Sequence, residues 1–502
     1  MPKEHEKILE FKNKKFEQKH PVLIVADFES SLKTVNQNLG EKTVQIQEHI
    51  PNSFSFYICY DKDQIQTDNV FVEFSVNDDN ENIGERFCEE IEKAVYDIHD
   101  NHFNPKAMLA LTQEQKVKHK TAKTCYACHK VFTEKNYKVR DHNHFNGKYR
   151  GAACNKCNLQ LQAPDFIPVY FHNLSGYDAH LFVKNLKGRL NVIAKNSENY
   201  ISFSKELQVD EHKTLSIRFL DSYRLMQSSL ANLAKNLPNS EKKNLAQFFQ
   251  GDQFDLVTRK GIYPYEWVDS YEKFDEKELP PIEAFSSTLN ATHISVEDYN
   301  HAQHVWKTFD CKTFRDYHNL YLKTDVLLLA DILENFRQTC MTIYSLDPVW
   351  AYSASGLSWQ AMLKKTDVNI ELLTDVDMYN FFECGIRGGI CQSSHRYAKA
   401  NNPYLKDFDS EKPISYITYV DANNLYGLSM SEKLPHSNFK WMTSSELVAW
   451  QSMPCTLEVD LDYPQHLHDL HNAYPLAPEH VNDKLIPNLR NKKKYILYIT
   501  RL

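Results

Sequence analysis

The chain has 502 residues, a formal net charge of −8 and 42% hydrophobic residues, with 28 Tyr, 28 Phe and only 13 Gly. This composition excludes an intrinsically disordered protein, and the length predicts roughly three domains. No apolar run is long enough to span a bilayer, and the charged N-terminus lacks a signal peptide's apolar core, so we expect an intracellular protein with no membrane partner.

Predicted strands and helices are interspersed along the chain, which is typical of a mixed α/β fold. Short apolar, β-branched runs predict the strands, and apolar residues at helical spacing, such as Ile83, Phe87, Ile91 and Val95, predict the helices. Strands are expected at 21–30, 54–60, 70–76, 166–174, 215–223 and 414–421, helices at 82–100 and 319–336, and a proline-containing loop at 275–285.

Carboxylate residues recur in three stretches that lie far apart in the sequence. Asp27 and Glu29 stand at i and i+2 after an apolar strand, so alternation places both carboxylates on one face. Asp178 follows a strand directly, and Tyr321 and Asp325 stand four residues apart on one helix face. Two-metal phosphodiester hydrolysis needs several carboxylates around ions about 4 Å apart, and a group that aligns the attacking water. Taken singly, Asp178 fits an N-cap and Tyr321 fits core packing.

In order and setting, these stretches resemble the three exonuclease motifs of family B DNA polymerases. The resemblance implies an RNase H-like 3′→5′ exonuclease in which the four acids bind Mg²⁺ or Mn²⁺, Tyr321 assists, and Asn173 touches the single-stranded 3′ end. "SSLANL" (228–233) is similar to a DNA-binding element of the protein-primed subgroup, through Ser229 and Leu230, but it also reads as an ordinary helix start.

"YVDANNLYGL" resembles polymerase motif A, which implies that Asp421 binds the catalytic metal ion and that Tyr426 lies under the nucleotide sugar. Asn424 and Gly427 depart from the usual Ser and Pro of that motif. The glycine pair in "GIRGGI" (385–390) resembles the linker between the exonuclease and polymerase domains.

Two further polymerase motifs, B and C, are not found after Asp421. Asp460 and Asp462 in "VDLDY" follow too closely to be motif C, so we read them as alternation on an ordinary strand. We therefore expect a fragment that keeps the exonuclease site and motif A, with doubtful polymerase activity of its own.

The segment between the first two exonuclease motifs carries two CxxC pairs, Cys125/Cys128 and Cys154/Cys157. Four thiolates in two knuckles suit tetrahedral Zn²⁺, and eleven cysteines without a secretory signal favour metal over disulfides. The basic run 116–123 lies just upstream and reads either as a solvated surface or as a DNA contact.

The same segment resembles the recombination endonuclease VII family, a His-Me finger nuclease. The resemblance implies that Asp141 and Asn158 hold a divalent ion and that His142 activates water. The other interpretation is a zinc-stapled insertion that only widens the DNA surface, and both stay open.

As a whole, the chain resembles the organellar and viral type of family B polymerase, of the protein-primed kind carried by Maverick (Polinton) mobile elements. The implied partners are primer-template DNA, dNTP and a protein primer, and a mobile-element origin implies a nuclear location. The alternatives are a zinc-stapled endonuclease or a degenerate DNA-binding protein. The expected domains are an N-terminal exonuclease part at 1–120, the zinc insertion at 121–160, the rest of the exonuclease at 161–345, and the start of the polymerase palm at 346–502.

Overall fold

The computed structural model describes residues 1–40, 43–77, 81–196, 199–211, 213–287, 293–394, 396–482 and 484–499. The chain forms two compact units, Phe11–Thr366 and Met1–Glu10 with Asp367–Leu502, and each is described by itself. The first unit continues past residue 345, the boundary expected from the sequence. It does so because α10 (Ala354–Thr366) contributes Leu357 and Ala361 to a small core with Cys340 of the preceding long helix.

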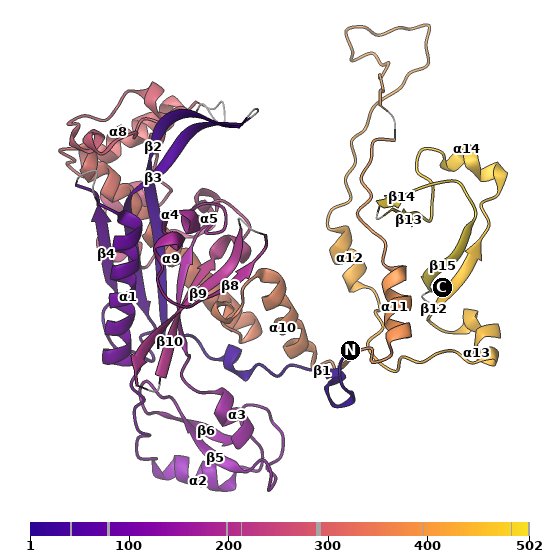
Figure 1. The fold of residues 1–502 in the computed structure, drawn as a ribbon, viewed down its shortest axis with the longest axis horizontal. Coiled ribbons are helices and arrows are strands. Elements are labelled where there is room, and N and C mark those ends of the chain that lie inside the picture. The colour runs from indigo at the N-terminus through magenta and orange to yellow at the C-terminus, as the bar shows by residue number, and fades with distance from the viewer. Residues whose placement is uncertain are drawn as a thin grey trace. The chain divides into compact units, whose positions relative to one another are not determined.

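A mixed seven-stranded sheet organises the larger unit, in the order β4-β3-β2-β7-β10-β9-β8. Neighbours are antiparallel except for the central pairs β2–β7 and β7–β10, which are parallel. Figure 1 shows β2 and β3 continuing beyond the other strands as a two-stranded ribbon. The strands are β2 (Val22–Gly40), β3 (Thr43–Tyr60), β4 (Val70–Ser75), β7 (Phe166–Phe171), β8 (Leu190–Ala194), β9 (Tyr200–Asp210) and β10 (Lys213–Asp221).

Helices cover both faces of this sheet, which explains why its central strands read as continuous apolar runs. In β2, Ile24 and Ala26 join the core on the side of α1, whereas Leu23 and Val25 join the core that contains the middle of α9. The predicted helices at 82–100 and 319–336 are confirmed. The helices are α1 (Ile83–His102), α4 (Asp178–Phe182), α5 (Leu230–Asn236), α6 (Leu245–Phe248), α7 (Asp252–Val257), α8 (Val296–Thr308) and α9 (Phe314–Tyr344).

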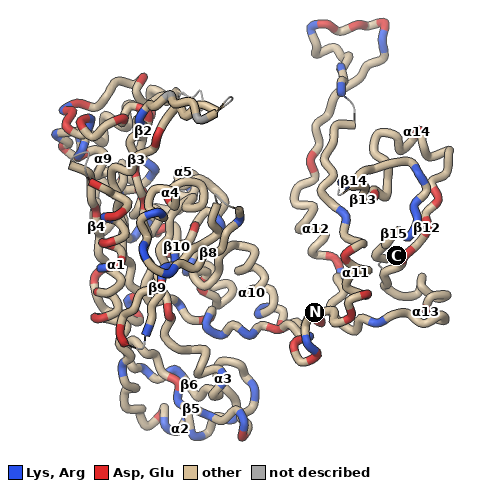
Figure 2. Tube along the Cα trace, viewed as in Figure 1, with Lys and Arg blue, Asp and Glu red and all other residues tan. Residues whose placement is uncertain are grey.

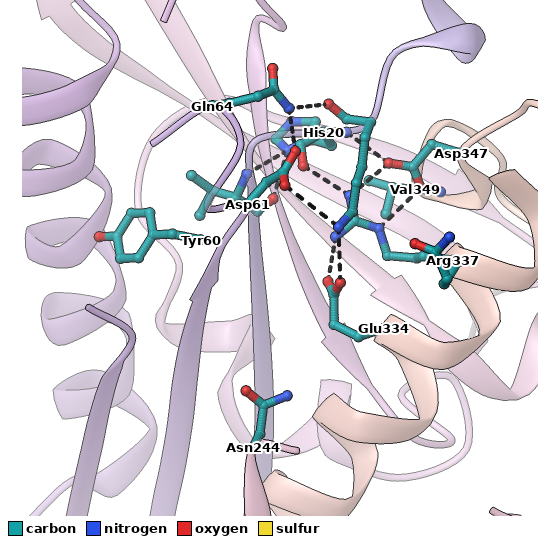
Figure 3. Close-up of polar contacts among 12 residues, drawn as sticks. His20, Tyr60, Asp61, Gln64, Asn244, Glu334, Arg337, Asp347 and Val349 are labelled. Atoms are coloured by element: carbon teal, nitrogen blue, oxygen red, sulfur yellow. Dashed lines mark hydrogen bonds and ion pairs between the residues drawn. The ribbon is translucent and has the colours of Figure 1, made fainter. Parts of the chain in front are cut away.

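A buried polar network ties the start of β2 to α9 and to the turn that follows it (Figure 3). The Arg337 guanidinium donates to Asp347 at 2.6 and 3.1 Å, to Glu334, and to the carbonyl oxygen of His20 at 2.8 Å. Asp347 also accepts the backbone N–H of His20 at 2.7 Å. Arg337 and Asp347 are 2% and 0% exposed, so each neutralises a charge that water does not reach.

The inserted unit (residues 112–162) interrupts the chain between α1 and β7. It consists of α2 (Gln113–Thr121), the antiparallel pair β5 (Lys138–His142) and β6 (Tyr149–Cys154), and α3 (Asn155–Gln160). The turn between β5 and β6 attaches it to the core: Asn143 donates to Gln64 at 3.2 Å, and Asn146 donates to the carbonyl oxygen of Asp63 at 3.0 Å.

Short elements make up the smaller unit, and one predicted strand is wrong. Residues 414–421 form no strand; Ser415 bridges Asn401, and the rest finds no neighbouring strand among the described residues. As predicted, Asp460 lies on a strand, β12, where it is paired with Lys493 at 2.8 Å, whereas Asp462 directly follows the end of that strand. The elements are β1 (Ile8–Leu9) paired with β11 (Ile370–Glu371), β12 (Cys455–Leu461) with β15 (Lys492–Ile499), β13 (Glu479–Val481) with β14 (Lys484–Ile486), and helices α11 (Val376–Gly385), α12 (Leu425–Ser431), α13 (Ser444–Val448) and α14 (His468–His471).

Among the residues that the structure describes, no helix combines the length and the apolar character that crossing a membrane requires.

We predict that Arg337→Met lowers the free energy of unfolding by about 3–5 kcal/mol, because it leaves Asp347 buried without its cation. Urea unfolding followed by tryptophan fluorescence measures this, since Trp350 lies directly beside the network. The control is Lys312→Met. The side chains of Lys312 and its partner Asp310 are 72% and 81% exposed, so their ion pair should contribute less than about 1 kcal/mol to the free energy of unfolding. Equal effects of the two substitutions would contradict the role given to Arg337.

Candidate nuclease site

Three predicted carboxylates meet where β2 passes the middle of α9. Asp27 and Glu29 continue the odd-numbered face of β2 beyond Val25, and Asp325 comes from α9, whose neighbouring residues pack on that same face. Each of the three offers a carboxylate oxygen, and these oxygens lie within 4.8 Å of one another. The i and i+2 spacing on the strand is therefore what brings two acids to one face, as expected.

Asp178, the fourth acid, lies at the start of α4 and is 3% exposed. Its Oδ1 atom and the Oδ1 atom of Asp325 are both buried without a hydrogen-bond partner. Buried carboxylate oxygens are costly unless something neutralises them. Two unpartnered oxygens beside two further acids therefore fit a site that binds cations.

The electrostatics describe a site with an excess of negative charge. Burial, followed by the charge of Asp325, raises the pKa of Asp27 to about 7. Burial and the charge of Asp27 raise the pKa of Glu29 and that of Asp178 well above their ordinary values. Without a bound cation, the site therefore holds protons at a pH where ordinary carboxyl groups have lost them.

Lys260 is a member of this site that the sequence analysis missed. Its ammonium group is paired with Asp325 and lies 4.9 Å from the centre of the Tyr321 ring. Burial alone would lower the pKa of Lys260, but Asp325 and the other nearby acids raise it above the ordinary value for lysine. The signal was present as "KGIYPY", a lysine directly before a tyrosine-rich turn, but only the fold brings it to α9.

Tyr321 is held in a fixed orientation. Its hydroxyl shares a hydrogen bond of 2.6 Å with the hydroxyl of Tyr265, and its ring packs over the backbone at Gly261. A Cβ atom at Gly261 would lie 2.7 Å from the ring, so glycine is required there. Burial raises the pKa of Tyr321 well above its ordinary value, so its hydroxyl acts as a neutral hydrogen-bonding group.

The loop between β7 and α4 is shaped by Asp221, a second residue that the sequence analysis missed. Its carboxylate accepts the backbone N–H groups of Asn173 and Ser175 at 2.9 and 3.1 Å. Asn173 has a φ of 73°, in the left-handed region that asparagine tolerates. Any Cβ atom at Gly176 would lie 2.5 Å from the side chain of Asn173, so the glycine lets the loop close over this side chain.

Tyr177 lies between this loop and the projecting ribbon. Its hydroxyl hydrogen-bonds to Nδ1 of His49 at 2.9 Å and to the hydroxyl of Ser30. His49 and Ser30 belong to no sequence motif, so only the pairing of β2 with β3 reveals them.

Ser229 and Leu230 form an ordinary helix start, which was one of the two interpretations of their sequence. Ser229 caps α5 by accepting the N–H of Asn232 at 3.3 Å, and Leu230 is buried.

The four cysteines of the inserted unit come together as expected. Each offers a sulfur atom, and the four sulfurs of Cys125, Cys128, Cys154 and Cys157 lie within 4.8 Å of one another. All four cysteines are free thiols. Four such donors fit a tetrahedral zinc ion.

Asp141, in contrast, is already neutralised by protein groups. It is 0% exposed, accepts from Arg150 at 2.7 and 2.8 Å, and accepts from the hydroxyl of Tyr126 at 2.5 Å. Its two oxygens therefore both have protein partners. The ring of the adjacent His142 stacks on that of His144 at 4.7 Å.

Two predicted residues of the polymerase half stand apart from any cluster. Asp421 is exposed and has no polar partner among the described residues, and Tyr426 is 82% exposed. Asn424 has a φ of 56° and caps α12 by accepting the N–H of Gly427 at 3.1 Å. Asn158 lies on α3, where its backbone carbonyl oxygen accepts from the side-chain amide of Gln162 at 2.7 Å.

The inserted unit lies within a stretch of the chain that matches a known family. The family "Recombination endonuclease VII" matches residues 100–171. A "Probable DNA polymerase" of Podospora anserina is 22% identical over 337 residues, and the match covers 58% of this chain and 25% of the relative, so the chain spans about a quarter of that relative's length.

Solved structures of Phi29 DNA polymerase are also similar. The complex with primer-template DNA and incoming nucleotides has 11% identity and a TM-score of 0.30, covering 74% of this chain and 40% of that one. The complex with single-stranded DNA has 11% identity and a TM-score of 0.29, covering 77% and 42%.

The family "DNA polymerase type B, organellar and viral" matches residues 162–502, which is more than half of the chain. The chain belongs to this family.

Proposed function

We propose that the larger unit is a cation-dependent 3′→5′ exonuclease that acts on single-stranded DNA ends within a family B polymerase. One observation carries the proposal: Asp27, Glu29 and Asp325 offer carboxylate oxygens within 4.8 Å of one another, Asp178 is buried near Glu29, and two of the buried oxygens have no hydrogen-bond partner. Among the described residues, Lys260 is the one lysine paired with an acid there. The arrangement fits an RNase H-like domain, with the inserted unit as a zinc-stapled addition.

Each residue has a role that follows from its position. Asp27, Glu29, Asp178 and Asp325 would hold Mg²⁺ or Mn²⁺, which when bound would supply activation of the attacking water and stabilisation of the charge that develops on the phosphate and the leaving 3′ oxygen. The hydroxyl of Tyr321, fixed by Tyr265, positions the attacking water. Lys260 orients Asp325 and offsets part of the negative charge that would repel the DNA phosphates. Asn173 and Tyr177, on the loop between β7 and α4, contact the DNA strand.

The polymerase assignments rest on the family alone. Asp421 binds the catalytic metal ion and Tyr426 the nucleotide sugar, with dNTP, primer-template DNA and a protein primer as partners. These stay predictions, as do a mobile-element origin and a nuclear location.

We predict that Asp27→Ala/Glu29→Ala slows the digestion of a single-stranded oligonucleotide at least about a hundredfold in Mn²⁺, because the ions lose two ligands. Gel analysis of a 5′-labelled oligonucleotide measures the rate. The matched control is Glu458→Ala/Asp460→Ala, an exposed i and i+2 acid pair on β12, which should leave the rate unchanged. No digestion by a well-folded wild-type chain would refute the proposed function.

The affinity of the site for Mn²⁺ should depend on pH. Asp27 has a pKa of about 7 without metal, so below that pH the ion has to displace a proton. We expect the affinity to rise at least about tenfold per pH unit from pH 5.5 to 7. Without metal, the free energy of unfolding should fall as the pH rises from about 4 to 7, because the folded state holds the extra proton. Calorimetric titrations with Mn²⁺ at each pH measure the affinity, and an affinity that is constant below pH 7 would contradict the role given to Asp27.

A second candidate function, an endonuclease in the inserted unit, is favoured by the match of residues 100–171 to endonuclease VII. The pairing of Asp141 with Arg150 and Tyr126 weighs against it, because protein groups already neutralise that carboxylate and hydrogen-bond to both of its oxygens. We therefore favour an insertion that does not cut.

We predict that the wild-type chain leaves supercoiled circular DNA intact in Mg²⁺ or Mn²⁺, since an exonuclease needs an end. Agarose gels detect nicking. Nicking that His142→Ala abolishes, with zinc content and exonuclease rate unchanged, would establish the endonuclease instead. DNA binding with no hydrolysis of either substrate would favour the degenerate DNA-binding protein.

A further inference from the structure

We propose that the inserted unit is an electrostatic anchor that binds the phosphate backbone of double-stranded DNA. The proposal rests on the proposed function insofar as DNA is the substrate of the same chain. It adds a second contact with that substrate, away from the carboxylate site.

The distribution of charge is the first observation. The inserted unit holds eleven Lys or Arg residues against three Asp or Glu residues, a net charge of +8 within a chain of net charge −8. The remainder of the chain therefore carries −16. Figure 2 shows basic residues predominating along α2, β5, β6 and α3. A basic surface within an acidic protein is better explained by a polyanionic partner than by a role in solubility.

The arrangement of the lysines is the second observation. Gln115, His119 and Ala122 are the half-buried row of α2, and His119 holds the hydroxyl of Tyr149 on β6 at 2.9 Å. Lys116 and Lys120, one turn apart, therefore lie on an outer row, with Lys123 just beyond the end of the helix. All three are exposed, and none has an acidic partner among the described residues. We call these three lysines the basic row.

The C-terminal end of α2 is also made positive. Lys138 donates to the carbonyl oxygens of His119, Lys120 and Ala122 at 2.9, 3.1 and 3.0 Å. Free carbonyl groups at a helix end present a partial negative charge, which would oppose phosphate binding. The ammonium group of Lys138 offsets it, so the basic row is not weakened by its own helix.

The side-chain types indicate which form of DNA binds. Proteins that bind single strands combine basic grooves with aromatic rings on which the bases stack. In the inserted unit, the Tyr126 ring is packed over Gly151 and its hydroxyl is bound to Asp141. Among the Tyr and Phe rings of residues 112–162, Tyr137 is the most exposed, at 54%. Lysines without stacking rings suit the regularly spaced phosphates of a duplex.

The attachment of the unit makes such binding useful to the exonuclease. The turn at Asn143–Asn146 bonds to the core, and the ring of Phe145 packs on that of Phe103 at 5.2 Å. A duplex held by the basic row is thereby tethered to the compact unit that contains the carboxylate site. Tethering raises the effective concentration of the DNA end.

The test measures duplex affinity in the full chain, with Asp27→Ala/Glu29→Ala present throughout so that no DNA is digested. The variant Lys116→Gln/Lys120→Gln/Lys123→Gln is compared with the control Lys93→Gln/Lys277→Gln/Lys307→Gln, three exposed lysines outside the inserted unit. The probe is a 30-base-pair blunt duplex, titrated by fluorescence anisotropy at several salt concentrations with zinc retained.

We expect the basic-row variant to bind the duplex at least about tenfold more weakly at low salt, with a salt slope reduced by about 3, and the control to match its parent. Unchanged affinity and slope in the basic-row variant would overturn the proposal. A loss confined to single-stranded DNA would overturn the assignment to duplex. An equal loss on duplex RNA would overturn DNA as the particular partner.

The outcome is independent of the exonuclease proposal. Binding is measured in a background that cannot cut, and cutting is measured on short single strands. With Asp27 and Glu29 intact, the basic-row variant should digest such short strands at the wild-type rate. A failed exonuclease with intact duplex binding, or the reverse, therefore identifies which of the two proposals is wrong.

Discussion

The central constraint on this structure is a concentration of buried negative charge that the chain itself does not neutralise. Three acids meet within 4.8 Å and a fourth adjoins them, with Lys260 as the one ammonium group paired there among the described residues. Such a cluster destabilises a folded protein unless protons or cations occupy it. The rest of the larger unit can be understood as the framework that holds these acids together.

That framework is rigid because it is covered on both sides. β2 is packed on its two faces by separate cores, so its register is fixed along its buried length. The Arg337–Asp347 pair then fixes the start of β2 against the far end of α9. The acid-bearing strand and the acid-bearing helix are therefore joined twice, once at the site and once at the polar network.

The buried carboxylates of the larger unit differ in whether protein groups satisfy their oxygens. Asp347 and Asp141 are fully buried, and in each both oxygens accept from an arginine and at least one oxygen accepts from a further donor. Asp178 and Asp325 each retain a buried oxygen without a partner. A satisfied carboxylate stabilises the fold, whereas an unsatisfied one indicates a ligand. The inserted unit thus lies in a stretch that matches a nuclease family, while protein groups satisfy both oxygens of its Asp141.

The sequence by itself determined the local elements and the donor types. Alternation placed Asp27 and Glu29 on one face, helical spacing joined Tyr321 to Asp325, and paired CxxC motifs predicted the four-sulfur cluster. Each of these predictions rests on residues that stand a few positions apart or within one knuckle.

Only the tertiary structure decided the partners that come from distant segments. Only the fold brings Lys260, Asp221 and His49 to the site, and their roles arise from strand pairing and helix packing. The occupation of Asp141 by Arg150 likewise depends on the antiparallel pairing of β5 with β6. The prediction of a strand before Asp421 was wrong for the same reason. A strand is stable only beside a neighbouring strand, and local sequence does not specify that neighbour.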